Sequence, residues 1–95
     1  MRQTIEVLPM GPRQYAATVG EGQEVTHHRI TVSEQVLADL QLPDVDERHL
    51  VEETIGYLLE REPGTSLPHD IDTDQIYRDD DQYLTELRDR LLGRT

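Results

Sequence analysis

The chain of 95 residues contains no cysteine, phenylalanine or tryptophan. Without cysteine it can form no disulfide, no thiolate zinc site and no cysteine nucleophile. Its aromatic residues are all tyrosine, so aliphatic side chains must supply most of the buried apolar surface. Leu, Ile and Val make up about a quarter of the chain, which exceeds the level typical of disordered proteins. The composition therefore predicts one small folded domain.

Long apolar runs are absent as well. No stretch approaches the roughly 18 apolar residues that a membrane-spanning helix needs, and the N-terminus lacks the apolar segment of a secretory signal. We therefore expect a cytoplasmic protein with no membrane partner. Lysine, asparagine and phenylalanine, whose codons are rich in A and T, are all missing, which indicates a GC-rich bacterial genome.

The formal charge of −11 is carried by only one part of the chain. Residues 1–32 contain three Arg and three Glu, whereas residues 33–95 contain seventeen acidic residues and six Arg. This excess of negative charge repels phosphate and so argues against a nucleic-acid partner. Many of the acids precede predicted helices, where the helix dipole stabilises a carboxylate.

Apolar and polar residues alternate in residues 3–32, which is the period of half-buried strands. Strands are expected over residues 3–8, 15–19 and 24–32. Turns are expected at Pro9–Pro12 and at Gly20–Gly22. This part of the chain predicts a three-stranded antiparallel meander.

The third predicted strand changes phase within its length. Val25 is odd-numbered, whereas Ile30 and Val32 are even-numbered. Because side chains alternate between the two faces of a strand, a β-bulge near His27 and His28 is expected to restore the inward face.

After Val32 the apolar period becomes 3.6, which predicts helices. Ser33 is expected to cap a short helix that ends before Pro43. A longer helix is expected from Asp44, which forms a capping-box pattern with Glu47, to Glu62. Its buried stripe is predicted to consist of Leu50, Val51, Thr54, Ile55, Leu58 and Leu59.

A loop over residues 65–70, a single helical turn over 73–77 and a final helix over 80–92 complete the pattern. Residues 1–95 are therefore expected to form a single domain, strand-rich in 1–32 and helical and acidic in 33–95. The fold class is α+β: a three-stranded antiparallel meander followed by a short helix, a long amphipathic helix, a helical turn and a C-terminal helix. The helices are expected to cover one face of the sheet.

Gly56 and Tyr57 are neighbours within the long predicted helix. Glycine costs a helix about 1 kcal/mol relative to alanine, so Gly56 indicates either close approach by another helix or partner, or a tolerated small residue. Tyr57 is interpreted as an exposed contact or as an amphipathic ring at the edge of the core.

Alternating carboxylates at Asp70, Asp72 and Asp74, with Asp81 twelfth in the frame, give the chain a weak similarity to an EF-hand calcium loop. Gln75 stands where that loop needs glycine, and Asp81 stands in place of the bidentate glutamate. The same carboxylates can cap helices, and this interpretation is favoured over calcium binding.

His27 and His28 are the other candidates for a metal site. As neighbours in a strand they point to opposite faces, so they can share one metal ion only if the predicted bulge redirects one of them. The favoured interpretation is that one histidine is partly buried in the sheet and the other is in solvent.

The strand-like segment Arg29-Ile30-Thr31-Val32 precedes helix-like segments at Ser33–Leu40 and Leu50–Leu59. Over residues 29–59 this order resembles the ribbon-helix-helix family of bacterial DNA-binding regulators and antitoxins. The resemblance implies that two subunits pair these strands and that Arg29 and Thr31 enter the major groove. Two predicted strands precede the segment, unlike in the family, and only one cation lies on its outward face.

The chain also resembles small uncharacterised bacterial proteins in which a His-Arg strand leads into helices and a segment like Leu58–Pro63 closes the main helix. Such proteins have no established activity. With no nucleophile, metal set or phosphate loop evident, we predict a non-enzymatic protein–protein interaction or accessory module without a cofactor, able to form a homodimer through an exposed sheet edge. The alternatives are a ribbon-helix-helix-like regulator or antitoxin, and a small enzyme or metal-binding domain that uses His27 and His28.

Overall fold

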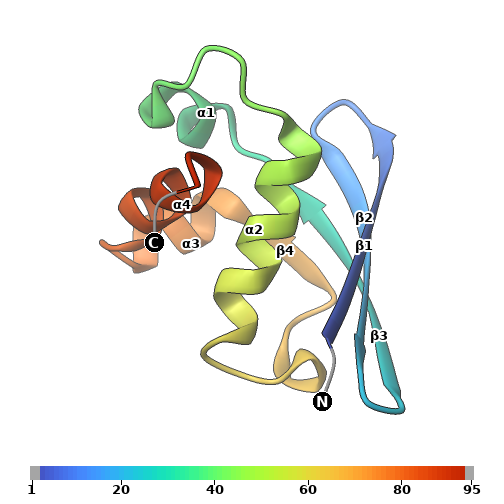
Figure 1. Ribbon diagram of the computed structural model, residues 1–95. Coiled ribbons are helices and arrows are strands. Elements are labelled where there is room, and N and C mark those ends of the chain that lie inside the picture. The colour runs from blue at the N-terminus through green and yellow to red at the C-terminus, as the bar shows by residue number, and fades with distance from the viewer. Residues whose placement is uncertain (1–2, 94–95) are drawn as a thin grey trace.

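The computed structural model describes residues 3–93, and it has the predicted α+β class (Figure 1). The elements follow in the order β1 (Gln3–Gly11), β2 (Gln14–Glu21), β3 (Glu24–Thr31), α1 (Glu34–Leu40), α2 (Glu47–Leu59), a 3₁₀ turn η1 (Gly64–Ser66), β4 (Asp70–Asp72), α3 (Thr73–Asp79) and α4 (Tyr83–Leu91). Three antiparallel strands thus precede the helices, as predicted. The helices lie on one side of the sheet, with α2 between the sheet and the other helices.

The sheet has a fourth strand that the sequence did not predict. Strand order is β1-β2-β3-β4, and β4 pairs in parallel with residues 29–31 of β3. Only three residues form β4, which is too short for a period of two to stand out. The segment interpreted as a calcium-loop candidate therefore contributes an edge of the sheet.

The predicted β-bulge at His27 and His28 is wrong. The register of β2 with β3 runs without interruption from Gln14↔Thr31 to Glu21↔Glu24. Val25 lies out of phase because it points outward and is 58% exposed. The predicted bulge requires Val25 to face inward. The spacing of apolar residues alone cannot distinguish an exposed valine from a buried one.

The irregularity of the sheet lies instead in β1, between Pro9 and Gly11. β1 continues through the predicted turn to Gly11, and Pro12 and Arg13 make a tighter turn. Arg13 takes the left-handed conformation, with φ of 58°. After a proline, whose ring fixes φ at about −65°, a positive φ at the next residue is typical of a type II turn. Proline lacks an N–H group, so Pro9 is compatible with a strand that has a neighbour on one side only.

The caps of α1 and α2 set where the helices begin. Ser33 caps α1 as predicted, its Oγ accepting from the N–H groups of Gln35 at 3.1 Å and Val36 at 3.3 Å. Helix α2 is capped by Asp46, whose Oδ1 accepts from the N–H of Arg48 at 3.0 Å, rather than by Asp44. It ends at Leu59, three residues before the predicted end.

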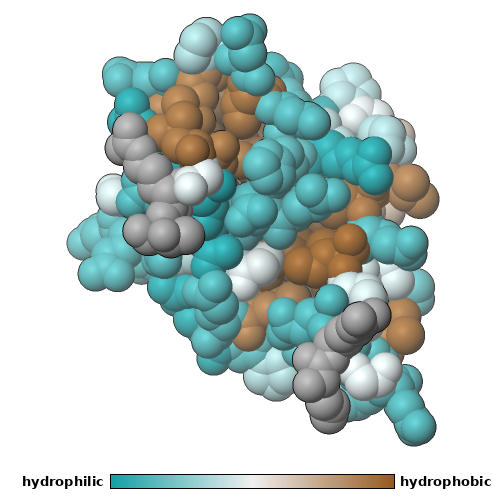
Figure 2. Space-filling model, in the orientation of Figure 1, coloured by the Kyte–Doolittle hydropathy of each residue, from teal (hydrophilic) through white to brown (hydrophobic). Residues whose placement is uncertain are grey.

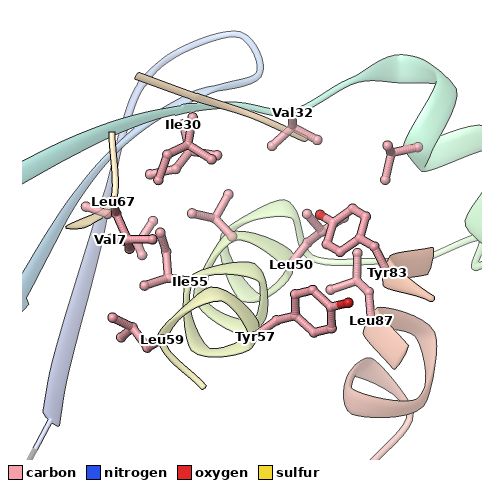
Figure 3. Packing of buried hydrophobic residues seen from close by; sticks show 14 of the residues in the cluster. Val7, Ile30, Val32, Leu50, Ile55, Tyr57, Leu59, Leu67, Tyr83 and Leu87 are labelled. Atoms are coloured by element: carbon pink, nitrogen blue, oxygen red, sulfur yellow. The ribbon is translucent and has the colours of Figure 1, made fainter. Parts of the chain in front are cut away.

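The core forms around α2, which contacts both the sheet and α4. Figure 3 shows Ile55 and Leu59 pointing toward Val7 of β1, and Tyr57 pointing toward Leu87 of α4. The predicted stripe of α2 is buried except for Leu58, which is partly exposed. The buried hydrophobic residues are Val7, Ala17, Val19, Ile30, Val32, Val36, Leu40, Leu50, Val51, Ile55, Tyr57, Leu59, Leu67, Ile71, Tyr83 and Leu87.

The last two helices differ from their predicted bounds by a few residues. The predicted turn over 73–77 is the full helix α3, and the helix predicted from residue 80 begins at Tyr83. Across residues 3–93, none of the helices combines the length and the apolar character needed to traverse a bilayer.

Candidate interaction surfaces

The three carboxylates of the calcium-loop candidate have local partners. Asp72 caps α3, because its Oδ1 accepts from the N–H of Asp74 at 2.9 Å. Asp74 pairs with Arg78 at 3.1 Å. Asp70 lies 3.8 Å from Arg29, so the preferred capping interpretation is confirmed for Asp72 and the other two form ion pairs. Within residues 3–93, no three or more His, Asp or Glu side chains are grouped so that they could hold a metal ion.

His27 and His28 lie on opposite faces of β3, as the favoured interpretation predicted. His28 is 4% exposed, and its Nδ1 lies 2.8 Å from the carbonyl oxygen of Pro68. Since a carbonyl only accepts, Nδ1 carries the proton, and in the neutral ring Nε2 accepts from the Thr26 hydroxyl at 2.9 Å. His27 is exposed and lies 3.4 Å from the hydroxyl of Thr18. The two rings therefore do not form one site.

Arg29 and Thr31, the DNA-contacting candidates, are both exposed on the outer face of β3. β3 is an interior strand, with β2 along one edge and β4 along the other at these residues. Pairing β3 with a second subunit would require one of these neighbours to leave, because each edge of a strand holds one partner.

Polar contacts that the sequence did not predict join α2 to α4 and to Asp80, which lies between α3 and α4. The hydroxyls of Thr54 and Tyr83 lie 2.8 Å apart in the core, and the Tyr57 hydroxyl donates to Asp80. The Arg61 guanidinium lies 3.6 Å from the centre of the Tyr57 ring. Burial, and secondly the hydrogen bond to Asp80, raise the pKa of Tyr57 to about 12, while that same bond lowers the pKa of Asp80. Tyr57 is fully buried, so its interpretation as an exposed contact is wrong.

Two arginines extend this attachment at the surface. Arg90 of α4 bonds Glu60 and lies 3.5 Å from Glu53, and Arg61 lies 3.6 Å from Glu86. A β-carbon at Gly56 would lie 3.5 Å from the Arg90 guanidinium, which is an ordinary contact distance to the end of a flexible side chain. The contact therefore does not require glycine, in agreement with the interpretation of Gly56 as a tolerated small residue. A groove of about 790 Å³ runs along this contact, with a lining of mostly carboxylates.

Among residues 3–93, no helix lies on the outer face of the sheet, and β1 has a neighbouring strand on one side only. Leu8 and Met10 of β1 are 64% and 56% exposed, and Val25 of β3 also projects outward. The exposure of Leu8 and Met10 had no distinctive sequence signal, because Leu8 ended the first predicted strand and Met10 fell in the turn predicted after it. Their exposure is a property of the tertiary structure.

Figure 2 views the helix-covered side of the molecule, in the orientation of Figure 1. Hydrophilic side chains cover much of this side. Hydrophobic side chains gather near α1 and α4 and between α2 and the sheet, and single ones project at the margin where the strands lie. The helical surface is thus mainly polar, in agreement with the position of the acidic residues after Val32.

Comparisons of the chain with protein-family models, with curated proteins and with solved structures gave no match. The two family resemblances seen in the sequence therefore stay predictions. Inference about function rests on the surfaces of the molecule itself.

Proposed function

We propose that this domain is a non-enzymatic protein-interaction or accessory module that binds another protein through β1 and the outer face of the sheet. The observation that carries this proposal is the free edge of β1, a nine-residue strand that pairs only with β2 in the described part of the chain, residues 3–93. An unpaired strand edge presents rows of N–H and C=O groups that an extended segment of a partner can pair with.

The side chains beside this edge support the same function. Leu8 and Met10 place apolar surface at one end of β1. The register sets Leu8 opposite Ala16 and Thr4 opposite Gly20, so small side chains lie beside β1 on the outer face. A sheet face with a few projecting apolar groups suits a protein partner, because shape complementarity needs no deep pocket.

The distribution of charge favours binding of a partner on this side of the domain over binding on the helical side. The first 32 residues carry no net charge, whereas the remainder carries the full −11. A partner that approaches β1 and the outer face avoids most of the acidic surface, and the partner therefore need not be basic.

The proposal is tested by placing a charge at Leu8. The immobilised domain is exposed to an extract of the source cell, and captured proteins are compared for the wild type, Leu8→Glu and the control Leu92→Glu. Leu92 is an exposed apolar residue on the opposite side of the fold, just after α4. We expect a specific partner that binds the wild type and Leu92→Glu, and that binds Leu8→Glu at least tenfold less. A partner set unaffected by Leu8→Glu, or a chain that is monomeric and captures nothing, would refute the proposal.

A DNA-binding regulator or antitoxin is a second candidate because Arg29 and Thr31 both lie on the open face. This candidate predicts that the protein shifts the mobility of DNA at low salt, and that Arg29→Ala weakens the shift. No shift at low salt, where phosphate contacts are strongest, would eliminate it.

A further inference from the structure

We infer that the partner segment at the β1 edge is an extended strand that carries a lysine or arginine opposite Glu6 and an apolar residue opposite Leu8. Such a segment is one case of the proposed function, so its chemistry rests on that function. Three features of β1 lead to it: the backbone groups that face away from β2, the charge of Glu6 and the exposure of Leu8.

Hydrogen bonds at the end of β3 fix the direction of the backbone groups in the sheet. Successive residues of an interior strand direct their N–H and C=O groups to alternate neighbours. The N–H of Arg29 donates to the carbonyl oxygen of His69 at 2.7 Å, on the β4 side. The N–H of Val32 donates to the carbonyl oxygen of Arg13 at 2.8 Å, on the β2 side. Even-numbered residues of β3 therefore bond toward β2.

The register carries this alternation across the sheet to β1. Even-numbered residues of β3 lie opposite odd-numbered residues of β2, so the even-numbered residues of β2 bond to β1. These lie opposite even-numbered residues of β1, as in Glu6 opposite Thr18. Ile5 and Val7 therefore direct their N–H and C=O groups to the free edge, where an added strand can bond to them.

Glu6 lies between these two residues and is the only ionisable residue within β1. Its side chain is exposed, and none of the ion pairs among residues 3–93 includes it. A residue opposite Glu6 on an added strand belongs to a non-hydrogen-bonded pair, in which the two side chains lie closest. A lysine or arginine there is attracted to the carboxylate, whereas an acidic residue is repelled. This requirement concerns one position, so the partner as a whole need not be basic.

Leu8 adds an apolar requirement two residues along β1. It is 64% exposed, and its neighbour on β2 is Ala16, whose side chain is short. An apolar side chain opposite Leu8 removes apolar surface of both residues from water. Pairing ends beyond this point, because Pro9 has no N–H group to direct to the free edge. The basic and apolar residues of the partner are therefore two positions apart on one face of its strand.

Selection from a displayed library of random peptides tests this chemistry. The library is selected on the wild type, on Glu6→Lys and on the control Asp81→Lys, which makes the same change of net charge. Asp81 is exposed beside α4, and α2 lies between α4 and the sheet. We expect the wild type and Asp81→Lys to select peptides with a lysine or arginine two positions from an apolar residue. Glu6→Lys should instead select an acidic residue at the basic position.

Binding of one selected peptide then locates the site. Replacing its basic residue by glutamate should weaken binding to the wild type by roughly two- to thirtyfold and tighten binding to Glu6→Lys, as measured by fluorescence anisotropy. In the free domain the N–H groups of Ile5 and Val7 should exchange with solvent rapidly, and the bound peptide should slow this exchange by at least about tenfold. Circular dichroism verifies that the variants are folded.

Three results would overturn the inference: no selected peptide, the same basic preference on Glu6→Lys as on the wild type, or a peptide that leaves the exchange of Ile5 and Val7 unchanged. If Leu8→Glu still abolished capture of a protein from the cell extract, the proposed function would stand and only the chemistry assigned to the partner would be rejected. If that capture failed as well, both would be rejected.

Discussion

The two sides of α2 are stabilised by different kinds of contact. Toward the sheet, Ile55 and Leu59 meet aliphatic side chains such as Val7 (Figure 3). Toward α4, the contact includes the paired hydroxyls of Thr54 and Tyr83 and the Tyr57 hydroxyl that donates to the Asp80 carboxylate, and Arg90 of α4 pairs with glutamates at the rim. Apolar contact is non-directional and scales with area, whereas hydrogen bonds and ion pairs need defined partners.

This difference predicts different responses to solvent conditions. Salt and pH should act on the α4 side, because ion pairs are screened and tyrosines titrate. The sheet side should respond less, since most of its contacts are aliphatic. Its charged contact with α2 is Glu47, which accepts from the Tyr15 hydroxyl at 3.1 Å; burial and then this bond raise the pKa of Tyr15.

Ile55→Ala should lower the free energy of unfolding by about 2 to 5 kcal/mol, because it leaves a cavity among fully buried side chains. Urea denaturation measures the loss, and it should be the same at low and high salt. The control Leu58→Ala removes the same type of side chain at a partly exposed position and should cost less than half as much. Equal losses would mean that burial does not distinguish the two faces of α2.

Alkaline pH should weaken the α4 side. The folded state holds Tyr57 protonated with a pKa of about 12, above the ordinary 10, so this contribution is complete below pH 10 and is lost as the pH rises through 12. The loss should be about 2 to 3 kcal/mol in the wild type and smaller in Tyr57→Phe. Unfolding free energies measured from pH 8 to 12 test this, and identical profiles for both proteins would contradict it.

Tyr83→Phe should cost about 1 to 3 kcal/mol, because it leaves the buried Thr54 hydroxyl without its partner. Adding Thr54→Val removes the orphaned hydroxyl and should recover part of the loss. A double-mutant cycle by urea denaturation measures the coupling. Strictly additive losses would show that the two hydroxyls do not interact.

Arg90→Met should cost only about 0.5 to 1 kcal/mol at low salt, since Glu60 is exposed and Glu53 partly so. The methionine keeps an apolar stem beside Tyr57. The cost should shrink toward zero in 1 M NaCl, where the Debye length is about 3 Å. A cost that is unchanged by salt would assign the role of Arg90 to packing rather than to charge.

Regular periods explain what the sequence could predict. The strands and the apolar stripe of α2 repeat every 2 or 3.6 residues, so their faces could be assigned from spacing alone. β4 spans three residues and its partner β3 lies about forty residues earlier, so no local pattern marks it. The outward position of Val25 could not be predicted from spacing, because the exposure of a side chain is decided by the tertiary structure.

The site contacts were less predictable than the fold. Thr54 and Tyr83 are 29 residues apart, and no local pattern joins them. Gly56 was not a signal for the contact of α2 with α4, because a β-carbon there would meet only the end of the Arg90 side chain at an ordinary distance of 3.5 Å. The free edge of β1 depends on strand order, which periodicity does not contain.

The parallel pairing of β3 with β4 has a consequence for the order of folding. The β1-β2 and β2-β3 hairpins close across two-residue turns, whereas Ile30 meets Ile71 only after the chain between them has returned to the sheet. Closing such a loop costs more chain entropy, so β4 should dock after the folding transition state has formed. Ile71→Val should then speed unfolding and leave the folding rate nearly unchanged, giving a φ-value near zero. The meander would therefore exist as a template before the acidic C-terminal part of the chain joins it.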